Sequence, residues 1–355
     1  MRLRAAQTHQ PAGPQGPGLT QTVRAFEWWE FKLAPIFAVA YATAHTLQLP
    51  LASLWPLFLL VLAALVPGAA YVSVLNDFTD IEDDLASGKP NRLAGRSRRF
   101  AAALLLCCIL PGVAVSFYWR RDPLLLGLYL AAWVAFTLYS ARPFRLKSRG
   151  LPGLLADASG AHLFPTLVVV VLVYRFGGAP VEPRWFAAVA VWALCLGLRG
   201  NLWHQLSDLR NDARVGLRTF ASRHKITLLR GLGNFVLFPA EAAAFALILW
   251  RAGGVAPLVA MLLYALLEGA RRAGWGMRLV VVVPKERASI LMLEYYEVFF
   301  PAAVIISSAL RHPSDALVLA AHLLLFRRRP AQCLKDAFTL LRQLSPKVLR
   351  GVRGI

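Results

Sequence analysis

The chain has 355 residues, of which 57% are hydrophobic and only 16% are charged, and its mean hydropathy is +0.53. So few charged residues could not cover a water-soluble globule, the apolar content excludes a disordered or collagen-like chain, and four cysteines are too few for a disulfide scaffold. The net charge of +20 would suggest nucleic acid as the partner of a soluble protein. Here the basic residues lie in short segments between apolar runs, so we expect a multi-pass integral membrane protein in contact with lipid and with no nucleic-acid partner.

Residues 1–25 contain closely spaced Gly, Pro and Gln, and we interpret them as a flexible cytoplasmic tail. The apolar runs begin after this tail. They lie near residues 31–49, 53–75, 100–119, 123–140, 151–174, 185–206, 227–250, 255–270 and 289–310. Most approach the roughly 20 residues that an α-helix needs to cross about 30 Å of hydrocarbon. The sequence therefore predicts an all-α membrane domain over residues 26–310 with about nine transmembrane helices.

Lys and Arg are concentrated in the connections that follow the second, fourth, sixth and eighth apolar runs. The other connections hold only Arg120, Arg121, Arg175, Arg184 and Arg251. The positive-inside rule therefore places the four basic connections on the cytoplasmic side. Residues 311–355 form a short apolar segment, from Ala316 to Phe326, and a basic C-terminal tail. The apolar segment is either a tenth, tilted or re-entrant helix or an interfacial helix, and the sequence leaves these alternatives open.

Two acidic stretches resemble each other within the chain. A shift of 128 residues aligns Asp80 with Asp208, Asp84 with Asp212, and Gly88 with Gly216. Internal repeats in membrane proteins commonly indicate two helical halves that meet at a binding site. We therefore expect two pseudo-repeated halves around a central cavity, with the acidic stretches at its cytoplasmic mouth.

Carboxylates four residues apart on a helix project from nearly the same face, so each stretch presents an acidic pair. Two such pairs that face each other require a cation between them. Oxygen ligands at this density suit Mg²⁺, which is commonly held by one or two carboxylates together with substrate phosphates. Nearby basic side chains would bind the remaining phosphate oxygens. These are Lys89, Arg92, Arg142, Arg145, Lys147 and Arg218. Because the site lies at the mouth of a helical bundle, we expect an isoprenoid diphosphate as the ligand.

Three stretches of the sequence resemble the UbiA superfamily of intramembrane prenyltransferases. They read Asn76-x₃-Asp80-x₃-Asp84 followed by Lys89-Pro90-Asn91-Arg92; Tyr139-Ser140-Ala141-Arg142-Pro143-Phe144-Arg145-Leu146-Lys147; and Asp208-x₃-Asp212-x₃-Gly216-x₂-Thr219. The first and third are similar to the two aspartate-rich motifs of the family. The second is similar to its Tyr-Ser-x-x-Pro-x-Arg-x-Lys loop. The resemblance covers roughly residues 28–310.

This resemblance implies Mg²⁺-dependent transfer of a prenyl group from a polyprenyl diphosphate to an aromatic or quinone-precursor acceptor, with release of pyrophosphate. It implies that the metal ligands are Asn76, Asp80, Asp84, Asp208 and Asp212. It also implies that the diphosphate is bound by Lys89, Arg92, Tyr139, Ser140, Arg145 and Lys147. The alternatives are the same chemistry on a sugar phosphate, a glycerol phosphate or a tetrapyrrole, and a non-catalytic lipid-binding or transport protein.

The sequence departs from the ubiquinone-type members of this family ahead of Asp208. Those members usually place an acid seven residues and a tyrosine four residues before this position, where this chain has Asn201 and His204. The acceptor is therefore open. His204 is a candidate catalytic residue, as a proton acceptor or an acceptor-positioning group, or it has a structural role at the helix end. Asp157 and His162 lie inside another apolar run, where ionisable groups tend to face a cavity, although His162 could equally be a packing residue.

Overall fold

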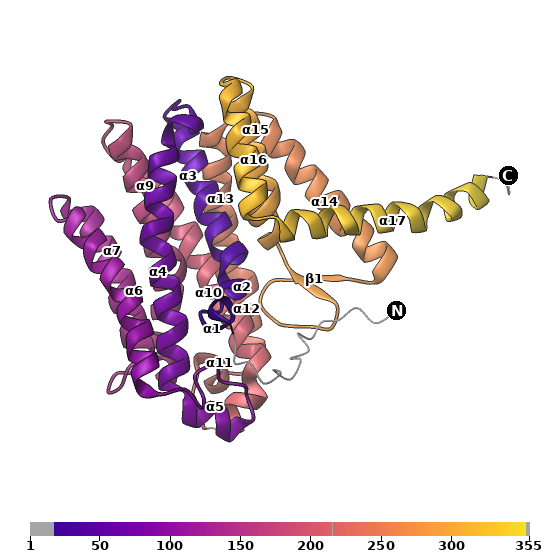
Figure 1. Ribbon diagram of the computed structural model, residues 1–355. Helices are drawn as coiled ribbons and strands as arrows, with labels where there is room; N and C mark the ends of the chain where they lie inside the picture. The colour runs from indigo at the N-terminus through magenta and orange to yellow at the C-terminus, as the bar shows by residue number, and fades with distance from the viewer. Residues whose placement is uncertain (1–17, 215, 353–355) are drawn as a thin grey trace.

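The structure, a computed structural model, describes residues 18–214 and 216–352, with the backbone alone from residue 344 onward. Most of the predicted tail, residues 1–17, lies outside the described residues. The helices up to residue 176 are α1 (Leu19–Thr22), α2 (Ala25–Trp28), α3 (Ala34–Thr46), α4 (Trp55–Thr79), α5 (Ile81–Ser87), α6 (Arg98–Tyr118), α7 (Pro123–Ser140), α8 (Leu151–Ala158) and α9 (Phe164–Phe176). The following helices are α10 (Pro183–Arg214), α11 (Phe220–Arg223), α12 (Ile226–Leu232), α13 (Phe238–Ala252), α14 (Ala256–Trp275), α15 (Phe300–Ala309), α16 (Ala316–Leu325) and α17 (Arg328–Val352). Figure 1 shows the long helices arranged as a bundle.

Eight of the nine predicted apolar runs coincide with helix over most of their length, and the run 289–310 is helical only in its later part. Within the described part of the chain, six helical stretches are long and apolar enough to cross a membrane. They are Leu51–Thr79, Arg98–Tyr118, Pro123–Ser140, Leu151–Phe176, Pro183–Arg214 and Ile226–Ala252. The other three runs form α3, α14 and α15, which do not meet this criterion. The count of nine transmembrane helices therefore stays a prediction.

Prolines account for four irregular turns inside the helical segments. Trp29–Leu33, Ser159–Leu163, Gly233–Leu237 and Tyr295–Phe299 are π-helical turns. A proline follows two residues after the end of each one, at Pro35, Pro165, Pro239 and Pro301. Proline has no N–H, and its ring clashes with the carbonyl group four residues earlier, so the preceding turn widens. Such turns are frequent at functional sites.

The centre of the bundle is formed by α3 and α9, in which almost every residue of 34–45 and 165–174 is buried. The outer helices instead keep apolar side chains exposed. On α6, for example, the exposed residues include Leu106, Leu110, Val113 and Phe117, which share one face of the helix. No described segment covers this face. An exposed apolar face of this size suits contact with lipid.

The region before α15 corrects the all-α expectation. Residues Arg278–Val280 (β1) and Ala288–Ile290 (β2) form a short parallel pair of strands. The apolar run predicted from residue 289 becomes helical only at Leu293. The segment from 278 to 290 is rich in Val and Ile, whose branched side chains favour strands.

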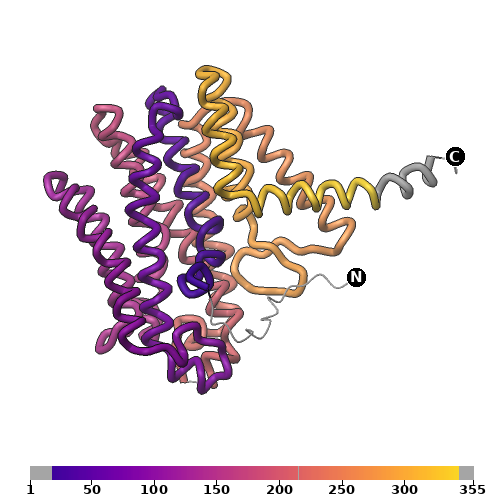
Figure 2. Tube along the Cα trace, viewed as in Figure 1, coloured from indigo at the N-terminus to yellow at the C-terminus, as the bar shows by residue number. Residues whose placement is uncertain are grey.

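The C-terminal segment folds back onto the bundle. α15 and α16 lie side by side, and α17 then leaves the bundle at a steep angle (Figures 1 and 2). The turn between α15 and α16 is fixed by buried Asp315, whose carboxylate accepts the N–H groups of Leu51 at 3.0 Å and Ala52 at 2.7 Å. α17 is fixed by Arg271, which donates to Asp336 at 2.7 Å. At about 20 Å, the 13 residues Pro313–Leu325 are too short to cross the hydrocarbon.

Candidate functional site

The three stretches singled out in the sequence are neighbours at one end of the bundle, where α5 and α11 lie (Figure 1). α5, which carries Asp84, contacts α10, which carries Asp208 and Asp212. The segment between α7 and α8 joins them, because Gly150 forms a β-bridge with Thr219 and the side chain of Arg223 donates to the carbonyl oxygen of Ser148 at 2.9 Å. Residues far apart in the chain therefore share one site.

Asp80 lies where α4 ends and α5 begins, and two basic side chains from the segment after α7 pair with it. Arg145 donates to its carboxylate at 2.9 Å, and Lys147 forms an ion pair with it. Lys147 also donates to the side-chain oxygen of Asn76 at 3.0 Å, as does the hydroxyl of Ser140 at 3.3 Å. Five of the predicted site residues are thus in direct contact.

The two basic residues that pair with Asp80 are both constrained, Arg145 by its backbone conformation and Lys147 by burial. Arg145 has φ = 39°, in the left-handed region, which costs a residue other than glycine on the order of 1–3 kcal/mol and is common at ligand clamps. It also pairs with Asp83. Lys147 is buried, and burial lowers the pKa of Lys147 while the adjacent Asp80 opposes this shift. Both cations therefore depend on nearby anionic groups.

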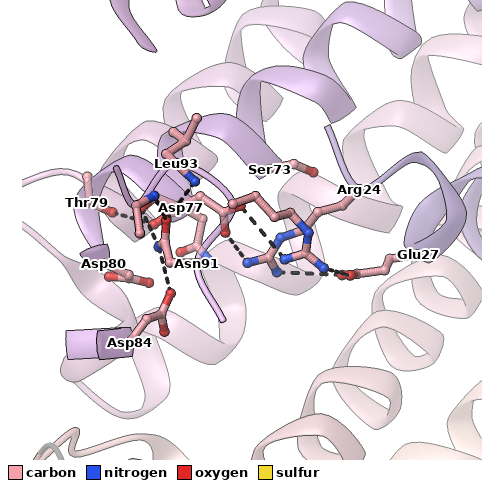
Figure 3. A network of polar contacts seen from close by, with 12 residues as sticks. Arg24, Glu27, Ser73, Asp77, Thr79, Asp80, Asp84, Asn91 and Leu93 are labelled. Atoms are coloured by element: carbon pink, nitrogen blue, oxygen red, sulfur yellow. Dashed lines mark hydrogen bonds and ion pairs between the residues drawn. The ribbon is translucent and has the colours of Figure 1, made fainter. Parts of the chain in front are cut away.

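Asn91 organises the segment around Asp84, a role that the sequence did not assign to it. Its amide donates to the Asp84 carboxylate at 2.8 Å and to the carbonyl oxygen of Asp77 at 2.7 Å. Its side-chain oxygen accepts the N–H of Leu93 at 3.0 Å (Figure 3). Asn91 is part of the predicted motif, seven residues after Asp84. Its place in that motif is the sequence signal that could have identified this role.

A second network joins the N-terminal segment to the first acidic stretch (Figure 3). The fully buried carboxylate of Asp77 pairs with Arg24. Arg92 donates to Glu27 at 2.6 Å and lies 3.8 Å from Asp77. Arg92, predicted to bind diphosphate, is thus turned toward this network. Arg24 belongs to the predicted tail but lies between α1 and α2, packed on the bundle, and no sequence signal connects it with a residue 53 positions away.

The second acidic stretch has fewer partners. Asp208 is half-exposed, and its carboxylate lies 3.4 Å from the amine of Lys89. Asp212 is buried, and both Lys89 and Lys147 are within electrostatic range of it. Tyr139 is within electrostatic range of Asp80 as well as Asp212. The two acidic stretches therefore approach each other around Lys89 and Lys147.

The two stretches also end in the same way. Gly88 and Gly216 have φ = 73° and 66°, a conformation that glycine adopts without strain. The next N–H group closes each turn. Lys89 donates to the carbonyl oxygen of Asp84 at 2.8 Å, and Leu217 donates to that of Asp212 at 2.9 Å. The sequence repeat thus extends to the backbone of these turns.

Three predicted site residues lie apart from these contacts. The side chains of Arg142 and Arg218 are exposed, and among the described residues they make no hydrogen bond or ion pair. His204 is also exposed, and its ring packs edge-on against Trp203 at a centroid distance of 5.2 Å. It lies one turn before Asp208 on α10.

The donor set fits Mg²⁺ in its chemistry, because it consists of carboxylate and amide oxygens. No three Asp, Glu, His or Cys side chains of the described residues converge on one point. Instead, Asp80 and Asp208 are balanced by Lys147, Arg145 and Lys89. This arrangement suits an ion that takes one or two carboxylates from the protein and the rest of its shell from water and phosphate.

An apolar cavity lies inside the bundle, next to the acidic residues. Its lining includes Ser73, one turn before Asn76 on α4, and the side chains of Trp28, Tyr71, Tyr129, Trp133 and Phe136. Trp133 packs against Tyr71 with ring centroids 4.9 Å apart. The cavity can enclose an apolar chain whose head lies among the charged residues.

Among solved structures, that of a UbiA homologue from Archaeoglobus fulgidus aligns with a TM-score of 0.51 and 16% identity, covering 85% of this chain and 98% of that chain. Structures of a UbiA homologue from this organism bound to GPP and Mg²⁺, or to DMAPP and Mg²⁺, each align with a TM-score of 0.44 and 14% identity, covering 91% and 92% of this chain and 99% of theirs. No curated protein matches the sequence. The model of the UbiA prenyltransferase family matches residues 33–275, more than half of the chain. The chain therefore belongs to the UbiA prenyltransferase family.

Proposed function

We propose that this protein transfers a prenyl group from a polyprenyl diphosphate to an aromatic or quinone-precursor acceptor within the membrane, in an Mg²⁺-dependent reaction that releases pyrophosphate. One observation carries the proposal: the two acidic stretches and the cations Lys89, Arg145 and Lys147 meet at the mouth of an apolar, aromatic-lined cavity. Membership of the UbiA family supports the same reaction class.

In this proposal, the diphosphate is bound by the basic side chains that form ion pairs with carboxylates in the structure. Lys89, Arg145 and Lys147 turn from Asp208 and Asp80 to the phosphate oxygens, with Tyr139 and Ser140 beside them. Asn76, Asp80, Asp84, Asp208 and Asp212 would hold Mg²⁺, which when bound would supply charge that stabilises the departing diphosphate. Arg92, Arg142 and Arg218 lie on the flanking segments and attract the anion from further away.

The allylic C–O bond breaks, and its electron pair leaves with the diphosphate. The cavity excludes water from the resulting prenyl cation, and the ring faces of Tyr71 and Trp133 stabilise its charge. The acceptor attacks this cation and loses a proton. We assign His204, on the same helix as Asp208, to accept this proton or to orient the acceptor.

The proposal includes a membrane topology. Residues 26–310 form the prenyltransferase domain with nine membrane-spanning segments in two related halves, and α5, the segment after α7 and α11 face the cytoplasm. The concentration of Lys and Arg in these connections supports this orientation. Residues 311–355 add the short apolar helix α16 and the basic α17, which suits the anionic surface of the cytoplasmic leaflet.

Pyrophosphate release from labelled geranyl diphosphate, measured in liposomes with a panel of acceptors, tests the proposal. Wild-type protein should release pyrophosphate and label one acceptor class only when Mg²⁺ is present. Asp122→Asn is a suitable control. Asp122 lies in the connection between α6 and α7 and pairs with Arg175 of α9, so its replacement should leave the rate unchanged. Absence of transfer to every acceptor, with intact fold and bound diphosphate, would exclude a transferase.

A further inference from the structure

Helix α17 presents an apolar face that no described segment covers. Leu334, Phe338 and Leu341 are 72%, 56% and 67% exposed. Successive residues of an α-helix are about 100° apart, so these three positions, with spacings of four and three residues, lie on one side of the helix. Cys333 and Leu340 are instead buried against α14. α17 therefore has one face packed on the bundle and a second, apolar face that is exposed.

α17 begins at the cytoplasmic end of the first apolar run in the proposed topology. The carboxylate of Glu30 accepts the N–H groups of Arg328 at 2.9 Å and Arg329 at 2.7 Å. The indole of Trp29 donates to the carbonyl oxygen of Leu325, just before α17, at 2.7 Å. Tryptophan is enriched at the membrane–water interface. A helix that leaves the bundle at a steep angle from this level would run along the membrane surface (Figures 1 and 2).

The charges of α17 also argue against a membrane crossing. Residues 328–352 include six Lys and Arg residues but a single acidic residue. Lys335 and Arg342 directly follow Leu334 and Leu341, so they lie about 100° round the helix, beside the apolar face. Both cationic side chains are exposed, and neither forms an ion pair with a described residue. An apolar face with a basic edge is the pattern of helices that lie in the surface of an anionic membrane.

We infer that α17 binds the surface of an anionic bilayer, with Leu334, Phe338 and Leu341 inserted at the boundary between headgroups and acyl chains. Lys335 and Arg342 bind the lipid phosphates from the edge of this face. The inference rests on the cytoplasmic topology of the proposed function. It goes beyond that topology because it assigns the side chains that enter the lipid and names anionic phospholipid as their partner.

Two observations favour lipid over a second copy of the chain as the occupant of this face. α14, on which α17 packs, exposes Leu258, Leu262 and Leu266 along one side, so α17 lies next to a surface that suits lipid. A contact between two copies through three side chains would bury far less than the roughly 1,200 Å² of a stable protein interface. A bilayer surface needs no such area from one helix face, because α17 is held on the membrane domain by Glu30 and Arg271.

Spin labelling of the full chain in liposomes that contain phosphatidylglycerol tests the inference. The label is carried by Leu334→Cys, Leu341→Cys or Gln332→Cys. The background is Cys107→Ser, because this cysteine is exposed whereas the other native cysteines are buried. Gln332 is exposed on the opposite side of α17 and is the matched control. Collisions with O₂, relative to those with a water-soluble nickel chelate, should be at least about threefold more frequent at the two leucine positions than at Gln332.

The charge of the lipid is tested with Lys335→Glu combined with Arg342→Glu. With the native charges, exchange of phosphatidylglycerol for zwitterionic phosphatidylcholine should lower the collision ratio at Leu334→Cys at least about twofold, because the negative surface potential is lost. Charge reversal should remove this dependence on the lipid. Arg311→Glu is the control, because Arg311 is exposed in the turn between α15 and α16 and should leave the dependence intact. Size-exclusion profiles check that the variants are folded.

Three outcomes would overturn the inference. Equal collision ratios at all three labels would place α17 in water. Spin–spin broadening at Leu334→Cys that disappears on dilution with unlabelled protein would place a second copy of the chain on the apolar face. A collision ratio that is the same in both lipids would remove the role of the anionic headgroup. These outcomes are distinct from failure of the proposed function, in which α17 enters the lipid but the protein neither binds geranyl diphosphate nor releases pyrophosphate.

Discussion

The two acidic stretches share a sequence pattern and a helix ending, but they differ in what surrounds them. Around Asp80 the helix breaks, and side chains from the N-terminal segment, the segment after α7 and Asn91 form a continuous network. Around Asp208 helix α10 continues to Arg214, and Lys89 is the one ion-pair partner among the described residues. The first stretch is thus preorganised by the protein, whereas the second is left open.

The largest effects should follow replacement of the central carboxylates. Asp80→Asn and Asp208→Asn should each lower the transfer rate by about 100-fold or more, because each removes a charge that, in the proposed function, binds Mg²⁺ at the departing diphosphate. Their stabilities should differ. Asp80→Asn leaves the buried Lys147 without its ion pair and should cost about 3 kcal/mol, whereas Asp208→Asn should change the free energy of unfolding by less than about 1 kcal/mol. Transfer assays and denaturant titrations in detergent measure both quantities.

Arg24→Gln should lower stability by about 3–5 kcal/mol, because it leaves the fully buried carboxylate of Asp77 with only the distant Arg92. Arg24→Lys keeps the charge and should recover much of this loss. Denaturant titration is the measurement. An unchanged midpoint for Arg24→Gln would show that the N-terminal segment does not support the first stretch.

The two helix endings should respond alike, in contrast to the carboxylates. Gly88→Ala and Gly216→Ala each place a side chain at positive φ, with no neighbouring atom within 4 Å, and should each cost about 1 kcal/mol. Gly127→Ala, on α7 and also without a neighbour within 4 Å, is the matched control with ordinary helical φ and should not destabilise. A cost at only one of the two endings would break the local equivalence of the stretches.

The smallest effect on stability should come from Lys89→Gln. The Lys89 to Asp208 pair is partly exposed, so its loss should cost less than about 1 kcal/mol. The apparent affinity for prenyl diphosphate should nevertheless fall about tenfold, because this amine lies between the two stretches and, in the proposed function, binds phosphate. A reduced stability with unchanged affinity would make Lys89 a structural residue.

Much of the helical scaffold could be predicted from sequence because apolar runs of membrane length leave few alternatives. The run 123–140 coincides with α7 (Pro123–Ser140). The correspondence between Asp80 and Asp208 is visible as an internal repeat of the sequence. Contacts that depend on tertiary folding could not be predicted. Arg24 lies in a polar segment without a pattern, and the direction in which Arg92 turns depends on Glu27.

The central claim is that both acidic stretches bind one diphosphate through Mg²⁺, and a double-mutant cycle tests it most directly. Binding of geranyl diphosphate would be measured with Mg²⁺ and with EDTA for wild type, Asp84→Asn, Asp212→Asn and the double variant. We predict that EDTA abolishes binding and that the two substitutions are non-additive by more than about 0.5 kcal/mol, as expected for groups that share a ligand. Additive effects, or binding that persists in EDTA, would contradict the account.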